Sequence, residues 1–241
     1  MVTCDALIVG GGPAGSTCAW QLRRAGLDVM VVDAATFPRD KVCAGWITPQ
    51  VVTALRFDTE AYAGRRTCQP ITGFRVGLIG GRGETAVAYD RPISFGIRRC
   101  EFDHYLLQRA DARLVLGAPI ASIRRERGQW IVNDEIRAPM LIGAGGSGCP
   151  VARMLNGVTH ARPLVVAREA ESRIDAGRPR LARDRTRRAG AVLLPRSPGL
   201  RLVRAQLASS ATINRDIPRV RAHSGSQLCR RPVPVPWQSP H

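Results

Sequence analysis

Three glycines near the start of the chain have the spacing of a dinucleotide-binding turn. They are Gly10, Gly12 and Gly15, and the acidic residue Asp33 stands 18 positions after the last of them. Glycines at this spacing allow a sharp turn, open the backbone to a diphosphate and let the next helix pack closely on a strand. A carboxylate at the Asp33 position accepts hydrogen bonds from an adenosine ribose and repels the 2′-phosphate of NADP.

The elements around these glycines predict one β-α-β unit. Residues 6–9 are a short apolar run typical of a buried parallel strand, and residues 27–33 form a second such run. Residues 16–25 between them have helical composition, with Gly26 as the C-cap. The start of this helix would present free N–H groups and positive dipole to a diphosphate. The glycine fingerprint alone does not distinguish FAD from NAD.

Residues 37–49 follow the second strand and predict a loop. A simple NAD-binding unit would enter its next helix here, which argues against an NAD-dependent dehydrogenase. Arg39 and Lys41 carry charge that could meet phosphate. The next small residues would fit against a flat ring, and they are Cys43, Ala44 and Gly45. The alternative interpretation is an ordinary surface loop.

The rest of the N-terminal part predicts an antiparallel β insert at about residues 72–98, built from strands at 73–78, 84–89 and 93–97. An amphipathic helix follows over 98–110, with Phe102, Leu106 and Ala110 facing inward. His104 and Tyr105 fit packing and surface positions better than catalytic roles. A strand at 112–116, a hairpin over 121–132 and a buried strand at 140–144 complete the pattern, and a second glycine-rich turn covers 143–148.

Taken in order, these motifs resemble those of the FAD-dependent oxidoreductases of the geranylgeranyl-reductase-like group, within the para-hydroxybenzoate-hydroxylase-type flavoprotein superfamily. The resemblance covers about residues 3–170. It is carried by the glycine turn with Asp33, by Pro38-Arg39-Asp40-Lys41-x-Cys43-Ala44-Gly45, by Arg99-x-x-Phe102-Asp103, and by Ile142-Gly143-Ala144-Gly145-Gly146 with Arg153.

The resemblance implies roles for the matching positions toward the nucleotide half of FAD. Asp33 would hold the ribose, where the family more often has Glu. Arg99 would reach the phosphate or ribitol region, Arg39 would meet phosphate charge, and Ile120 would contact adenine through its backbone. The diphosphate would lie on the turn and helix start formed by Gly10, Gly12, Ala14 and Gly15.

The resemblance also implies which residues lie beside the isoalloxazine, namely Cys43, Ala44 and Gly45. Cys43 is the one side chain near the flavin that we nominate, and a small packing residue is an equal interpretation. NAD(P)H is compatible as the electron donor. However, many superfamily members have Asp where Gly145 stands, so no docking site for NAD(P)H is carried over.

Residues 171–241 do not match the resemblance. They hold 15 basic and 4 acidic side chains and 8 of the 17 prolines, and no Gly-Asp dipeptide, which the family carries in its C-terminal half, follows Arg153. One interpretation is a native disordered basic arm that binds anions or nucleic acid. The interpretation that we favour is a reading-frame break near residues 172–180 of a GC-rich gene. A flavin site without its C-terminal half would retain FAD weakly.

Composition excludes several other classes of protein. Seven cysteines form no CxxC pair and only four histidines are present, so a zinc framework or other metal site is not expected. No run of about 18 apolar residues predicts a membrane span. The N-terminus has no basic region typical of a secretory signal, so we expect a cytoplasmic protein. The +17 net charge comes mostly from residues 171–241, which weakens a nucleic-acid-binding interpretation.

The sequence therefore predicts an α/β fold with a Rossmann-like FAD-binding core over residues 1–170, an antiparallel β insert, and a C-terminal part that is truncated or out of frame. The predicted activity is that of an FAD-dependent oxidoreductase, either an isoprenoid double-bond reductase or a flavin monooxygenase, which this chain alone need not retain. The predicted partner is a small, apolar or isoprenoid substrate, and peripheral contact with a membrane stays open.

Overall fold

A four-stranded parallel sheet forms the centre of the computed structural model. The structure describes residues 1–77, 84–157, 167–168 and 207–208. The strand order of the central sheet is β13 (Met140–Gly143), β2 (Ala6–Val9), β3 (Val29–Asp33) and β9 (Arg113–Leu116), and all neighbours are parallel. Strands β2 and β3 are rich in β-branched and aliphatic residues because the sheet is covered on both faces.

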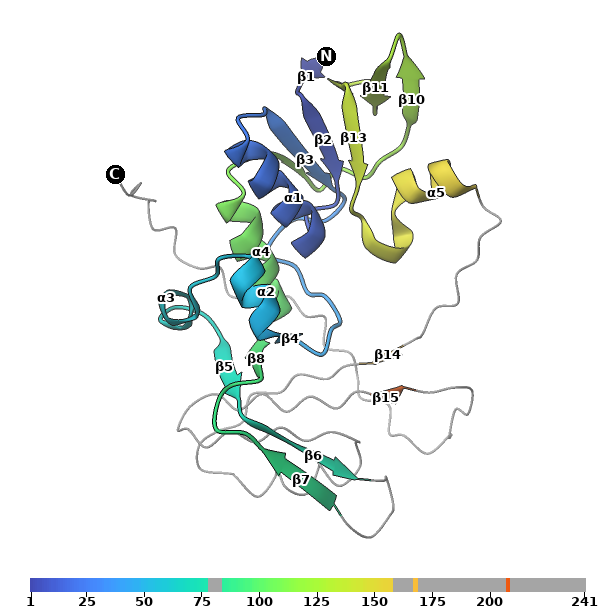
Figure 1. The fold of residues 1–241 in the computed structure, drawn as a ribbon. Helices are drawn as coiled ribbons and strands as arrows, with labels where there is room; N and C mark the ends of the chain where they lie inside the picture. The colour runs from blue at the N-terminus through green and yellow to red at the C-terminus, as the bar shows by residue number, and fades with distance from the viewer. Residues whose placement is uncertain (78–83, 158–166, 169–206, 209–241) are drawn as a thin grey trace.

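Helices α1 (Pro13–Arg24) and α4 (Arg99–Arg109) pack together on one face of this sheet (Figure 1). Helix α1 connects β2 to β3, as the sequence predicts for a β-α-β unit. The interface buries small and aliphatic side chains from the sheet and both helices, namely Ala6, Ile8, Ala19, Val29, Val31, Leu107 and Ala110. This packing fixes the start of α1 directly beyond the carboxyl end of β2.

A second four-stranded sheet covers the opposite face. Its order is β1 (Val2–Thr3), β12 (Ile136–Ala138), β11 (Gln129–Val132) and β10 (Ile123–Glu126). Strands β10 and β11 form the predicted hairpin, whose turn residues Arg127 and Gly128 both have positive φ, as a tight two-residue turn requires. The apolar layer between the two sheets includes Leu7, Met30, Val32, Val132 and Ile136.

The predicted antiparallel insert lies between β3 and α4. It contains a three-stranded sheet of order β4 (Trp46–Ile47), β8 (Ser94–Ile97) and β5 (Cys68–Ile71), and a separate pair β6 (Gly73–Gly77) and β7 (Glu84–Ala88). Two short helices, α2 (Pro49–Ala54) and α3 (Thr59–Ala63), precede β5. The β6–β7 pair extends away from the central sheet (Figure 1).

Beyond β13, the chain forms the short 3-10 turn η1 (Gly146–Gly148) and helix α5 (Pro150–Asn156). A further antiparallel pair joins β14 (Ala167–Arg168) to β15 (Leu207–Ala208). Apart from these two short strands, the predictions for the end of the FAD-binding domain at residue 170 and for the tail over 171–241 lie outside the described residues.

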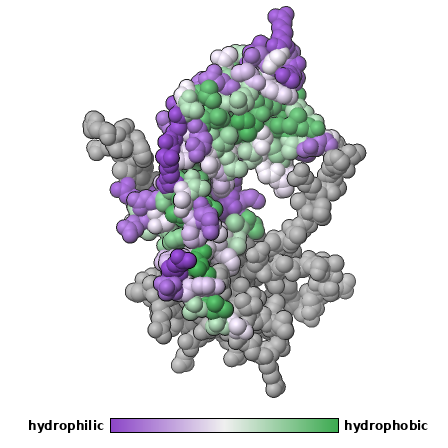
Figure 2. Space-filling view, in the orientation of Figure 1, coloured by the Kyte–Doolittle hydropathy of each residue, from purple (hydrophilic) through white to green (hydrophobic). Residues whose placement is uncertain are grey.

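The prediction that the strand at 140–144 is buried is wrong. Met140 is 44% exposed, because β13 is the edge strand of the central sheet. Met154 and Leu155 of α5 are also exposed, and apolar side chains gather on the surface over this part of the molecule (Figure 2). The parallel sheet therefore presents apolar surface at its β13 edge, unlike its helix-covered face.

We expect the half-buried His104 on α4 to make the stability of the chain depend on pH. Burial, followed by the charge of Arg66, lowers the pKa of His104 below its ordinary value of 6.5. Between the lower folded value and 6.5 the unfolded chain binds more protons, so the free energy of unfolding falls as the pH falls through that window. We expect His104→Gln to flatten this dependence, measured by urea denaturation at pH 7.5 and 5.5. Equal pH slopes in both proteins would contradict the assignment.

Candidate functional site

Two of the three fingerprint glycines are required by the packing of the chain itself. Gly10 has φ +113°, and a Cβ there would lie 2.5 Å from the Ala144 carbonyl oxygen. A Cβ on Gly15 would overlap the carbonyl oxygen of Gly10. The glycine-rich turn after β2 therefore touches the turn after β13 on one side and the first turn of α1 on the other.

Gly12 is different, because neither backbone nor packing requires a glycine there. Its φ of −70° and ψ of −177° are extended values that any residue adopts. Within the part of the chain that the structure describes, a Cβ on Gly12 would meet one atom within 4 Å, Nη2 of Arg39 at 3.4 Å. Protein contacts explain Gly10 and Gly15 but not Gly12, whose missing side chain leaves space beside the helix start. A diphosphate that approaches the backbone closely would use this space, so the turn fits FAD.

The start of α1 is available to an anion. Among the described residues, no side chain caps this helix, and its first turn contains no acidic residue. Pro13 occupies the first helical position, so its missing N–H costs nothing there. The buried Ser16 hydroxyl donates a hydrogen bond to the Gly11 carbonyl at 2.9 Å, which holds the turn against the helix. The positive end of the helix dipole thus faces the space beside Gly12.

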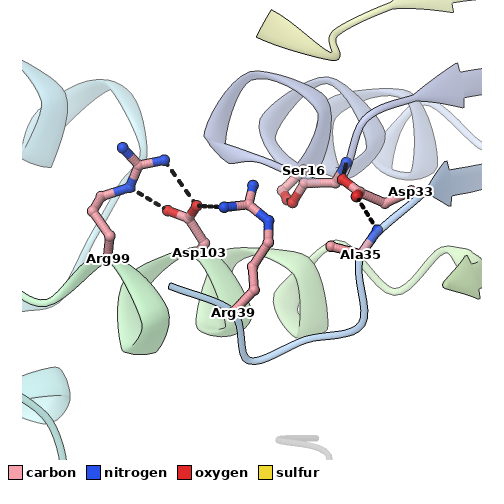
Figure 3. Close-up of polar contacts among 7 residues, drawn as sticks. Ser16, Asp33, Ala35, Arg39, Arg99 and Asp103 are labelled. Carbon is pink, nitrogen blue, oxygen red and sulfur yellow. Dashed lines mark hydrogen bonds and ion pairs between the residues drawn. The ribbon is translucent and has the colours of Figure 1, made fainter. Parts of the chain in front are cut away.

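Asp33, at the end of β3, turns its carboxylate toward the glycine turn (Figure 3). Its Oδ2 accepts a hydrogen bond from the Gly11 amide at 2.7 Å, and its Oδ1 accepts one from the Ala35 amide at 2.8 Å. Each carboxylate oxygen has a further lone pair, so acceptor capacity remains for ribose hydroxyls. Asp33 therefore lies between the carboxyl ends of β2 and β3, at the position that the fingerprint predicts.

A buried carboxylate joins two arginines beside the glycine turn (Figure 3). Asp103 on α4 accepts hydrogen bonds from Nε of Arg99 at 2.6 Å and from Nη2 of Arg99 at 2.8 Å. Nη1 of Arg39 lies 3.4 Å from Oδ2 of the same carboxylate. The hydrogen bonds to Asp103 raise the pKa of Arg99, against the opposing effect of burial. We call Arg39, Asp103 and Arg99 the arginine–aspartate triad.

The loop after Arg39 brings Cys43 to the same place. Cys43 is half-buried and its thiol interacts with the Arg99 guanidinium. Gly45 has φ +64°, and its carbonyl accepts a hydrogen bond from the Ile97 amide at 2.7 Å, which ties the loop to β8. Lys41 is exposed, whereas Arg39 is half-buried with Nη2 beside Gly12.

The remaining predicted residues surround the strand ends. Ala14 is exposed on the first turn of α1, and Ala44 is half-buried in the loop before Gly45. Ile120 is half-buried and packs against the apolar layer behind β3, two residues after Ala118, whose amide donates to the Asp33 carbonyl at 3.0 Å. The structure thus brings Gly12, Asp33 and Arg39 together at the carboxyl ends of β2 and β3.

Asp103, Ser16 and Phe37 also belong to the site, and no sequence pattern assigns them a role in it. The Phe37 ring lies under the Arg39 guanidinium, with its centroid 4.8 Å from Cζ. The spacing of Arg99 and Asp103, four residues apart on a helix, is a signal for their pairing. Within the part of the chain that the structure describes, no group of three or more His, Cys, Asp or Glu side chains could hold a metal ion. No helix among those residues is long and apolar enough to cross a bilayer.

Part of the chain matches a known protein family, and the chain is similar to proteins of known name. Residues 5–90 match the model of the family described as FAD dependent oxidoreductase. The chain is 33% identical over 166 residues to menaquinone reductase of Mycobacterium tuberculosis, covering 64% of this chain and 40% of that protein. It is 32% identical over 163 residues to geranylgeranyl diphosphate reductase of Rhodobacter capsulatus, covering 61% of this chain and 38% of that protein.

A solved structure shares the fold. The geranylgeranyl bacteriochlorophyll reductase-like protein of Thermoplasma acidophilum superposes with a TM-score of 0.61 at 18% identity, covering 86% of this chain and 57% of that one. By comparison, the chain spans about two fifths of the length of menaquinone reductase and of geranylgeranyl diphosphate reductase.

Proposed function

Because residues 5–90 match the FAD dependent oxidoreductase family, we propose that this chain binds FAD with the diphosphate against Gly12 and the start of α1. The observation that carries this proposal is the space at Gly12, which the fold itself does not require. In the proposed site, backbone amides of the turn and of Ala14 and Gly15 donate to the diphosphate. Gly10 and Gly15 allow the close packing that places those amides.

In this proposal, different charged residues bind different parts of FAD. Asp33 accepts from the ribose, and Arg39 and Arg99 supply positive charge to the phosphate and ribitol region. Ile120 contacts the adenine through its backbone. Cys43, Ala44 and Gly45 lie beside the flavin ring, where small side chains leave room for a flat ring. A bound flavin would supply the transfer of a hydride or electron pair to a substrate, and the residues named here bind and orient it.

We propose an apolar, isoprenoid-bearing small molecule as the substrate and reduction of a carbon–carbon double bond as the reaction. The names of two relatives support this choice, since one is a menaquinone reductase and the other a geranylgeranyl diphosphate reductase. Hydroxylation is the second candidate, and NAD(P)H is the proposed electron donor. We propose a cytoplasmic location, which fits the lack of a disulfide at Cys4, Cys18, Cys68 and Cys149 within the described residues.

The two alternatives from the sequence are not supported. An NAD-dependent dehydrogenase would continue from Asp33 into the next helix and strand of the parallel sheet. In this chain the next strand of that sheet is β9, which begins at Arg113, after the loop and the β insert. The comparisons support an oxidoreductase and give no support to a nucleic-acid-binding protein.

Equilibrium binding of FAD, FMN and NAD to the purified chain tests the proposal. We expect FAD to bind at least about tenfold more tightly than FMN, because FMN lacks the diphosphate and adenosine that the site recognises. Fluorescence quenching during titration measures the affinities, and chromatography of released flavin identifies it. Equal affinity for FAD and FMN, or preference for NAD, would overturn the assignment.

A further inference from the structure

We propose that Asp103 is a positioning residue that aims the guanidinium of Arg39 at the diphosphate-binding space beside Gly12. This inference rests on the proposed function and adds a residue to which that function gave no role. Asp103 does not itself touch the space beside Gly12. It acts through Arg39, and it is held in turn by Arg99.

The burial of Asp103 shows that the arginines determine where its carboxylate lies. The Asp103 side chain is 0% exposed, while those of Arg39 and Arg99 are 19% and 17% exposed. Removing a carboxylate from water is unfavourable unless cations and hydrogen-bond donors replace the water. The bidentate contact with Arg99 supplies two donors. It therefore fixes the orientation of the carboxylate that Arg39 meets.

Phe37 and Asp103 constrain the guanidinium of Arg39, and its Nη2 faces the space beside Gly12. The Phe37 ring lies 4.8 Å from Cζ of Arg39, and Asp103 Oδ2 lies 3.4 Å from Nη1. Nη2 lies 3.4 Å from the position that a Gly12 Cβ would take. Because the guanidinium is a rigid planar fork, holding Nη1 at Asp103 sets the direction of Nη2 toward the space beside Gly12.

The charge of the triad favours an anion in that space. One carboxylate between two guanidinium groups leaves one positive charge uncompensated within the triad. Nη1 of Arg39 is buried, and among the described residues it makes the 3.4 Å ion pair with Asp103 but no hydrogen bond. This charge lies beside the uncapped start of α1, whose dipole has the same sign. The two effects together favour a phosphate group over a neutral ligand.

A double-mutant cycle of Asp103→Asn and Arg39→Met tests the inference, with FAD, ADP and riboflavin as probes. Arg39→Met should weaken FAD and ADP binding by about tenfold to hundredfold, the range for loss of a charge-assisted hydrogen bond. Asp103→Asn should cause a loss of similar size. The double variant should bind no more than about threefold more weakly than Arg39→Met, because both changes remove one interaction. Riboflavin, which has no phosphate, should be affected little by either change.

A second variant keeps the test independent of how well Asp103→Asn folds. Arg39→Lys retains the charge but not the rigid fork that Asp103 orients, so it should bind FAD nearly as weakly as Arg39→Met. Restoration of FAD affinity by Arg39→Lys would overturn the inference. Glu101→Gln is the matched control, because Glu101 is another paired carboxylate on α4 that contacts Arg98 and the Thr67 amide. It should leave FAD affinity unchanged.

The outcomes separate this inference from the proposed function. Additive losses in the cycle, or an Asp103→Asn protein with lower thermal stability but unchanged ADP affinity, would mean a purely structural role and overturn the inference alone. Failure of the unmutated chain to bind FAD or ADP would overturn the proposed function, and the inference with it.

Discussion

Gly12→Asp should strongly weaken FAD binding while leaving the fold as stable as before or more so. Gly12 is the N-cap of α1 and has extended backbone angles suited to Asp. An Asp side chain there would accept hydrogen bonds from the first amides of α1 and lie near Arg39. It would occupy the amides and charge proposed for the diphosphate and repel it. We expect FAD affinity to fall by at least about a hundredfold, as charge repulsion adds to lost contacts.

Two measurements on the same protein check this expectation. FAD titration should show the loss, and urea denaturation should show a free energy of unfolding equal to or a few tenths of a kcal/mol above that of the parent, as for other improved caps. Gln21→Glu, which adds one negative charge at an exposed position farther along α1, is the matched control and should bind FAD normally. FAD affinity within threefold of the parent for Gly12→Asp would contradict the placement of the diphosphate.

Gly15→Ala should have the opposite effect and destabilise the fold itself. The added Cβ would overlap the Gly10 carbonyl oxygen and approach Ala144 Cβ to 3.3 Å. Gly10 has little room to move, because its amide donates to the Val32 carbonyl at 2.8 Å. The clash separates α1 from β2, and we expect a loss of about 3 kcal/mol, the upper part of the range for overpacking.

Urea denaturation followed by circular dichroism measures this loss. Gly148→Ala is the matched control, since a Cβ at Gly148 would meet no described residue within 4 Å and the change is otherwise identical. The control should lose no stability. If Gly15→Ala were as stable as Gly148→Ala, the close approach of α1 to the glycine turn would be wrong.

The sequence predicted the β-α-β unit well because several local signals agree there. An apolar run, a glycine turn, a helix composition and a second apolar run all require the same structure over residues 6–33. Strand β12 and helices α2 and α3 were not predicted. Their signals are short, such as the Asp58 side chain that caps the amides of Glu60 and Ala61. Helix α3 has five residues, which is too short for a helical pattern of apolar residues to show. It is stabilised by packing of Tyr62 into the apolar cluster with Phe57 and Phe102.

The site was predictable where its residues are local and not where they meet through packing. Gly12 and Asp33 follow from the fingerprint, and the Arg99–Asp103 pair follows from helix spacing. The approach of Arg39 to Asp103 depends on how the loop after β3 crosses α4, which no local pattern encodes. The exposure of β13 likewise depends on its position at the edge of the sheet. A pattern within one strand does not reveal whether another strand lies beside it.

Backbone amide shifts during titration with FAD test the central claim most directly. We expect the same set of amide signals to shift with FAD and with ADP, namely those of Gly11, Gly12, Ala14, Gly15 and Ser16. At saturation, FAD and ADP should give the same chemical shifts for these amides, because both ligands carry the diphosphate. Riboflavin, which has no phosphate, should leave these signals unchanged. Signals that respond equally to riboflavin, or that stay fixed at Gly12 and Ala14 while FAD binds elsewhere, would contradict it.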